Sequence, residues 1–157
     1  MKKFLLLLFI LLNMITYSEE ISKISENNLI AAFKNKGFKV KIDEDYIFLK
    51  KKYYTASQTS ICEQRVDIFI HNHRVFSIDL ISRNIRNSVT EETLRNNLKD
   101  MVKILKKEIV SKSFKTNIEK AFENVDSENF GLIESEEGII RTTSLSNAEK
   151  SLNISID

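Results

Sequence analysis

The sequence predicts an α+β fold in which helices pack against an antiparallel sheet, and three observations support this prediction. Residues 62–83 contain two runs of alternating apolar and polar residues around a short turn, which is typical of a β-hairpin. Residues 90–125 carry an apolar stripe at helical spacing. Helical and strand-like patterns occupy separate stretches of the chain, and this segregation is typical of α+β folds.

The first 18 residues have the features of a secretory signal peptide. Lys2 and Lys3 precede an unbroken apolar run over residues 4–12, which is shorter than the about 20 residues that a membrane-spanning helix needs. Small residues at positions 16 and 18 favour cleavage before Glu19. An uncleaved anchor is the alternative. Residues 19–157 are expected to form a single α+β domain.

The distribution of charge argues against a general nucleic-acid binder. The chain has 24 Lys and Arg against 22 Asp and Glu, and removal of Lys2 and Lys3 with the signal would balance the two. Nucleic-acid binders usually show a strong basic excess. Residues 34–52 nevertheless hold seven lysines against three acids, and residues 119–137 hold seven acids against one lysine. This asymmetry indicates either a partner surface or mutual pairing within the fold.

The mature chain is expected to begin with a helix and two strands. Residues 22–36 present an apolar helical face and are followed by Gly37, a residue that commonly ends helices. Residues 38–43 and 46–51 alternate as strands do. Residues 53–60 show no clear period and are expected to form a loop.

Two registers of the hairpin keep its apolar residues on one side. One sets Asp67 opposite Asp79, and the other sets Arg65 opposite Asp79 and pairs Ile68 with Phe76. Like charges directly opposite each other are destabilising by roughly 0.2–1 kcal/mol. We therefore expect the second register, which leaves a three-residue loop.

A long helix should follow the hairpin. Ser88 and Glu91 have the spacing of a capping box at its start, and the apolar stripe continues to about residue 109. Polar residues 111–113 interrupt the stripe, which resumes up to residue 125 as a second helix or after a kink.

The C-terminal part is expected to contribute more strand. Residues 130–134 and 138–143 form another predicted hairpin around Gly138. Residues 144–157 are ambiguous, and are predicted to form a last edge strand or a loosely ordered tail.

No catalytic residue, metal site or cofactor is expected from the Cys and His residues. Cys62 shares the parity of the core positions, and buried Cys behaves mostly as an apolar residue. His71 lies nine residues along the same strand, about 30 Å away, whereas a nucleophile and its base must be within about 3 Å. His71 and His73 alone supply too few ligands for zinc.

A weak set of binding candidates combines charge with aromatic rings. The lysine–tyrosine run could bind an anionic group by charge and stacking, although a strand end entering a solvated loop explains it equally well. On the outer side of the hairpin, apolar residues are either covered by a second layer or form an exposed contact patch. The candidates are Lys50, Lys51, Lys52, Tyr53, Tyr54, Arg65 and Phe69.

These observations favour a small exported bacterial protein that acts as a non-catalytic binding module, with another protein as partner, in the periplasm or outside the cell. The bacterial origin is inferred from a composition rich in lysine, isoleucine and asparagine. The membrane would be contacted only through the signal before cleavage. The alternative is a secreted hydrolase or carbohydrate-active enzyme that uses Asp67 and Asp79 as paired carboxylates. A structural subunit of an envelope assembly is a third possibility.

Overall fold

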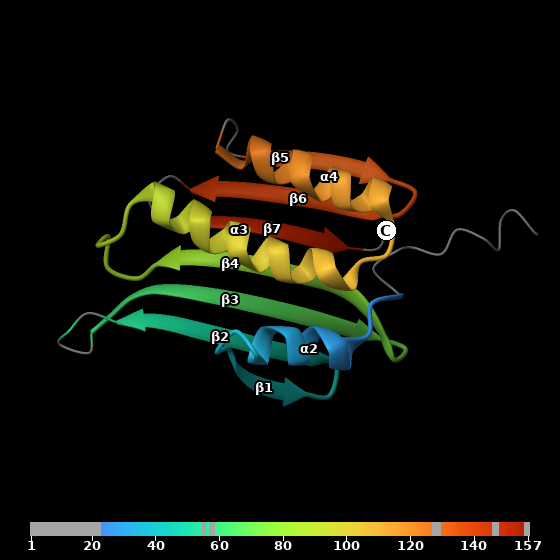
Figure 1. Cartoon of the computed structure of the whole chain (residues 1–157), viewed down its shortest axis with the longest axis horizontal. Helices are drawn as coiled ribbons and strands as arrows, with labels where there is room; N and C mark the ends of the chain where they lie inside the picture. Colours follow the sequence, from blue (N-terminus) through green and yellow to red (C-terminus); the bar gives the residue numbers. More distant parts are fainter. Residues whose placement is uncertain (1–22, 55, 57–58, 127–129, 146–147, 156–157) are drawn as a thin grey trace, which may run out of the picture.

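The computed structural model describes residues 23–54, 56, 59–126, 130–145 and 148–155, and within them the chain forms a seven-stranded antiparallel sheet with helices. The α+β prediction is confirmed. Figure 1 shows the sheet, whose strand order is β1-β2-β3-β4-β7-β6-β5. In chain order the elements are α2 (Glu26–Lys34), β1 (Lys39–Asp43), β2 (Tyr46–Tyr54), β3 (Ser60–His71), β4 (Arg74–Asn84), α3 (Glu91–Glu108), α4 (Lys112–Glu123), the 3₁₀ turn η2 (Asn124–Asp126), β5 (Phe130–Ser135), β6 (Gly138–Leu145) and β7 (Glu149–Ser155).

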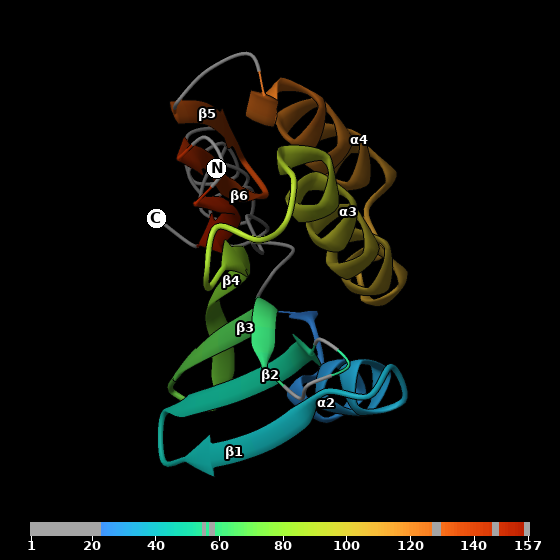
Figure 2. The same ribbon diagram turned by 90° about the vertical axis from the view of Figure 1, so that its left-hand side faces the viewer.

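The described helices α2, α3 and α4 all lie on one side of the sheet, as Figure 2 shows. Their apolar stripes pack on the strand residues that face them, which is how an amphipathic helix and a half-apolar sheet bury their surfaces together. The fully buried positions of this core include Phe33, Leu49, Ile68, Leu98 and Phe114. The opposite face of the sheet is left without a helix from the described part of the chain.

The helix starts are set by side-chain caps. Thr90, and not the predicted Ser88, caps α3, because its hydroxyl accepts a hydrogen bond from the backbone N–H of Thr93 at 3.2 Å. The backbone N–H of Ser88 instead donates to Asn84 Oδ1 at 3.1 Å. Ser111 caps a separate helix, α4, so the interruption in the apolar stripe is a break between two helices.

The register expected for the β3–β4 hairpin is wrong. Asp67 lies opposite Asp79, and Ile68 pairs with Ile78. Asn72 and His73 both have positive φ and form a two-residue turn. A bulge then leaves Phe76 without a cross-strand partner on β3, and the side chain of Phe76 is exposed.

The physical reason is that this register pairs branched aliphatic residues throughout the buried side. Cross-strand side-chain pairs contribute roughly 0.2–1 kcal/mol each, and the like-charge penalty is reduced because Arg65 binds Asp67 and Asn153 donates to Asp79. The bulge also reverses the parity of the β4 start, so Val75 enters the core.

The expectation of an edge strand or loose tail at residues 144–157 is also wrong. β7 lies in the interior of the sheet, between β4 and β6. Leu152 and Ile154 of β7 are fully buried. The predicted loop at residues 53–60 is shorter than expected, because β2 extends to Tyr54 and β3 begins at Ser60. The expected signal peptide, residues 1–18, lies outside the described residues.

Candidate functional site

The helix-free face of β1, β2 and β3 gathers aromatic and basic side chains. Ile47 and Leu49 of β2 are buried in the core, so the alternation of a strand turns Tyr46, Phe48 and Lys50 to the opposite face. On β3, Arg65 and Phe69 occupy the same face, since Tyr46 pairs with Phe69 and Lys50 pairs with Arg65. We call this set the open-face cluster: Tyr46, Phe48, Lys50, Arg65 and Phe69.

The rings and cations of the open-face cluster are in direct contact. The ring centroids of Tyr46 and Phe69 are 5.1 Å apart, and those of Tyr46 and Phe48 are 6.5 Å apart. The guanidinium carbon of Arg65 lies 4.9 Å from the centroid of Phe48, and Lys50 Nζ lies 5.2 Å from it. Cations at this distance from a ring face are attracted to it. Phe69 remains 38% exposed, so the cluster presents an apolar surface to solvent.

Arg65 is held rigidly by its neighbours. Its Nε donates to both carboxylate oxygens of Asp67, at 2.9 and 2.7 Å, and its terminal nitrogen donates to the hydroxyl of Tyr46 at 3.1 Å. Asp67 is buried. These hydrogen bonds raise the pKa of Arg65, with Asp67 as the main cause. Burial and Asp67 raise the pKa of Tyr46, so its hydroxyl stays neutral. A fixed guanidinium loses little entropy when it contacts a ligand.

A basic hollow adjoins the open-face cluster at the edge of the sheet. Its volume is about 520 Å³, and none of its described lining residues is acidic. Lys50 forms an ion pair with Glu63 of β3, with 2.8 Å between Lys50 Nζ and Glu63 Oε2. A smaller hollow of about 300 Å³ shares Lys41 and Phe48 with the first and is also lined by Asp43, Tyr46 and Arg65. The larger hollow is lined by Gly37, Lys39, Val40, Lys41, Phe48, Lys50, Lys51, Lys52 and Tyr54.

The structure separates the lysine–tyrosine run that the sequence presents as one unit. Lys50 and Lys52 belong to the open face, and Tyr54 lines the hollow beside them. Lys51 and Tyr53 have the opposite parity and face α3, where Tyr53 OH donates to Gln64 at 2.8 Å.

Sequence reasoning missed four residues of the site: Lys39, Lys41, Tyr46 and Phe48. The alternation of residues 38–43 and 46–51 already indicated which of them share a side. Which side the helices leave open could be learned only from the structure.

The two carboxylates of the alternative hypothesis are adjacent, but both are engaged. Asp67 is held by Arg65, while Asp79 accepts a hydrogen bond from Asn153 Nδ2. Asn153 also donates to Ser77 Oγ at 2.9 Å. Burial, followed by the charge of Asp67, raises the pKa of Asp79. Neither aspartate lines the two hollows described above.

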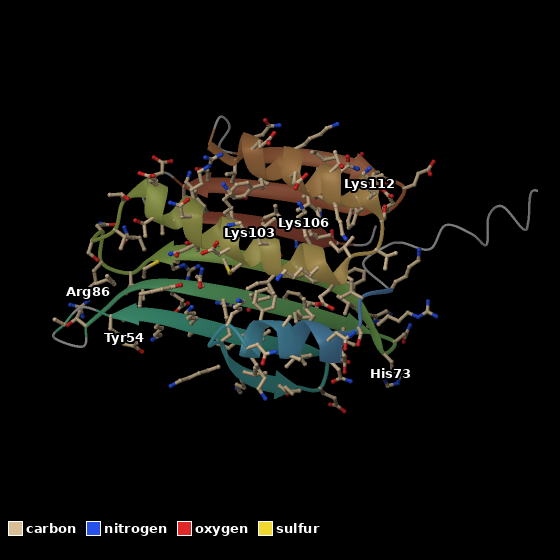
Figure 3. All side chains as sticks on the ribbon, in the orientation of Figure 1. Tyr54, His73, Arg86, Lys103, Lys106 and Lys112 are labelled. Carbon is tan, nitrogen blue, oxygen red and sulfur yellow. The ribbon has the colours of Figure 1, made fainter. Side chains whose placement is uncertain are left out.

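Cys62 and the two histidines lie at opposite ends of the β3–β4 hairpin. Cys62 pairs with Asn84 and is buried, whereas His71 pairs with Arg74 beside the turn. Figure 3 shows His73 at the far end of the sheet from Tyr54. A Cys–His dyad is therefore excluded by geometry. Among the residues described, no group of three or more His, Cys, Asp or Glu side chains is arranged to bind a metal ion.

Comparison with known proteins adds no identification: no family model matches the chain, and no curated protein or solved structure matches it. In the part of the chain that the structure describes, we find no helix long and apolar enough to span a membrane. The functional argument therefore depends on the geometry of the site.

Proposed function

We propose that this protein is a small exported, non-catalytic binding module that binds an acidic segment of another protein on the helix-free face of β1–β3. The observation that carries the proposal is the basic hollow, whose described lining residues include no acid, placed directly beside the open-face cluster. Aromatic residues and Arg supply much of the binding energy of protein interfaces. Lysines around them attract an acidic partner and orient it.

The layout of charge over the fold supports a partner surface. The basic residues 34–52 include β1 and β2, and the acidic residues 119–137 include β5. β1 and β5 are the two opposite edges of the sheet. Exposed charges further apart than about 10 Å are largely screened at ordinary salt, so these two strands cannot neutralise each other. The basic edge is thus available to a partner.

A second candidate function, hydrolysis with Asp67 and Asp79, is favoured by one observation. The observed register sets the two carboxylates directly opposite each other, and the pKa of Asp79 is raised, as in paired acid–base groups. Against it, Arg65 binds both oxygens of Asp67, and Asn153 donates to one oxygen of Asp79. The binding function therefore accounts for the open-face cluster and the basic hollow, whereas hydrolysis by Asp67 and Asp79 uses neither.

The test is affinity capture of exported proteins with three forms of the domain. The wild type is compared with a variant carrying Lys41→Glu, Lys50→Glu and Lys52→Glu, and with a control carrying Lys99→Glu, Lys112→Glu and Lys120→Glu. Both variants change the charge equally, but the control changes exposed lysines of α3 and α4. We expect the same protein to be recovered with the wild type and the control and lost with the open-face variant. Recovery should also fall with rising salt.

Equal recovery with the open-face variant would contradict the proposal. An anionic glycan or nucleic acid captured in place of a protein would also contradict it. The enzyme alternative is tested separately with Asp79→Asn, which leaves the hydrogen bonds between Arg65 and Asp67 in place. This variant should retain partner binding, and loss of a hydrolytic activity without loss of binding would support the second candidate instead.

A further inference from the structure

A separate cavity lies on the helix-covered side of the sheet, between the α2–β1 connection and α3. Its volume is about 290 Å³, and its lining comes from that connection, from β2 and β3, and from the second half of α3. Figure 3 views the molecule from this side and labels Lys103, which lines the cavity. The open-face cluster lies on the other side of the sheet, and the cavity shares Lys51 with the basic hollow.

The floor of the cavity is apolar and well packed. Phe38, Met101 and Ile104 line it, and all three are buried. Their packing in the core fixes the shape of the floor, because side chains in a dense interior have little freedom to move. The cavity therefore offers a preformed apolar surface, which is what most small-molecule sites provide.

One wall of the cavity is polar and held by a chain of hydrogen bonds. Tyr53 OH donates to Gln64 Oε1 at 2.8 Å, and Gln64 Nε2 donates to the backbone carbonyl of Asn97 at 2.9 Å. Gln64 is buried. Burial is also the main cause that raises the pKa of Tyr53, so the hydroxyl remains a donor. This chain ties β2 and β3 to α3 at the cavity.

The rim carries an excess of positive charge. Lys36, Lys51, Lys103 and Lys107 line the cavity, and Asp100 is the only acid among its lining residues in the described part of the chain. Asp100 forms an ion pair with Lys103, with 3.3 Å between Asp100 Oδ1 and Lys103 Nζ. Within the described part of the chain, Lys36, Lys51 and Lys107 form no ion pair. Like charges gathered around one opening repel each other, and an anion placed among them would relieve that repulsion.

We propose that this cavity binds a small organic anion, with its apolar body on the floor and its anionic group among the rim lysines. The volume lies at the lower end of the range for small-molecule sites, about 300–1,000 Å³. A compact ligand with one or two rings and a single carboxylate, sulfonate or phosphate group fits both the size and the lining.

The experiment is a fluorescence titration of the purified protein with naphthalene-1-sulfonate, an anion with a two-ring aromatic body. Two further probes separate the contributions: neutral naphthalene lacks the charge, and inorganic phosphate, used as a competitor, lacks the apolar body. We expect saturable binding of one sulfonate per protein. The neutral probe should bind at least about tenfold more weakly than the sulfonate. Phosphate should displace the sulfonate only poorly.

Variants assign the binding to the cavity. Lys103→Gln/Lys107→Gln should weaken sulfonate binding about tenfold, because two rim charges are removed. The matched control Lys112→Gln/Lys120→Gln removes two exposed lysines from α4 and should leave the affinity unchanged. Asp100→Asn removes the only acid of the lining and should tighten binding, which is a change in the opposite direction.

The proposal fails if sulfonate binding is not saturable, or if the control variant loses as much affinity as the rim variant. It also fails if the neutral probe binds as tightly as the sulfonate, since the rim lysines would then have no role. Because none of these variants changes an open-face residue, either result is independent of the test of the protein-binding function.

Discussion

Lys150 of β7 is fully buried, and its ammonium group donates a hydrogen bond to the carboxylate of Glu91, the first residue of α3, at 2.7 Å. Its second described hydrogen bond goes to Ser144 Oγ at 2.8 Å. A buried ammonium is costly unless it is paired and hydrogen-bonded. The ion pair therefore fastens the start of α3 to the interior strand β7.

Glu91→Gln should destabilise the fold because it removes the negative charge that faces Lys150. The loss is expected to be about 1–3 kcal/mol. Glu92→Gln is the matched control, since Glu92 lies in the same helical turn and is exposed. It should cost only a few tenths of a kcal/mol through the helix dipole. Urea denaturation of both variants measures the difference, and equal losses would show that the ion pair does not stabilise α3.

Leu152→Ala should destabilise the protein strongly, because Leu152 of β7 is fully buried in the core. Truncating a buried leucine usually costs about 2–5 kcal/mol. Leu145→Ala is the control, since Leu145 is 55% exposed and its truncation should cost less than about 0.5 kcal/mol. Chemical denaturation gives both values. A small effect at Leu152 would mean that β7 is not an interior strand.

Asp79→Asn should change how stability depends on pH. The pKa of Asp79 is raised above its ordinary value of 3.8, first by burial and then by Asp67. The folded state therefore holds the Asp79 proton more tightly than the unfolded state, and this carboxylate lowers stability as pH rises through the folded pKa. Relative to the wild type, the variant should gain stability as the pH rises above the ordinary pKa of 3.8 and through the raised pKa of the folded state.

The matched control for this pH prediction is Glu44→Gln, which removes an exposed carboxylate. Free energies of unfolding measured across the pH range should rise for Asp79→Asn and stay flat for the control, both relative to the wild type. A flat profile for Asp79→Asn would show that neither burial nor Asp67 raises the pKa of Asp79 in the folded protein.

Cys62 should react with a disulfide reagent only when the protein unfolds. The thiol is buried, and burial is the main cause that raises its pKa, so both access and the thiolate fraction are low. We expect reaction in the native protein to be about a hundredfold slower than in denaturant. In a Cys62→Ala/Val110→Cys control the new thiol replaces a side chain that is 82% exposed and should react fast in both states. Fast reaction of native Cys62 would contradict its burial.

Local patterns in the sequence were sufficient to predict the α+β class, most of the elements and the burial of Cys62. The apolar stripe of α3 repeats over its whole length, and the apolar residues of β3 and β4 alternate with polar ones over many positions. The pattern of each element therefore indicates which of its sides is buried. The cap of α3 was misplaced by two residues, because both Ser88 and Thr90 have the hydroxyl that a cap requires.

Register, strand order and the open side of the sheet were decided only in the tertiary structure. The bulge at Phe76 and the aliphatic pairs of the hairpin outweighed the repulsion of Asp67 and Asp79. β7 became an interior strand because β4 and β6, distant in sequence, both pair with it. The lysine–tyrosine run divided between two faces because β2 extends to Tyr54 and its residues alternate between the faces of the sheet. Periodicity describes each strand by itself, whereas these features depend on pairing and packing energies between strands that are far apart along the chain.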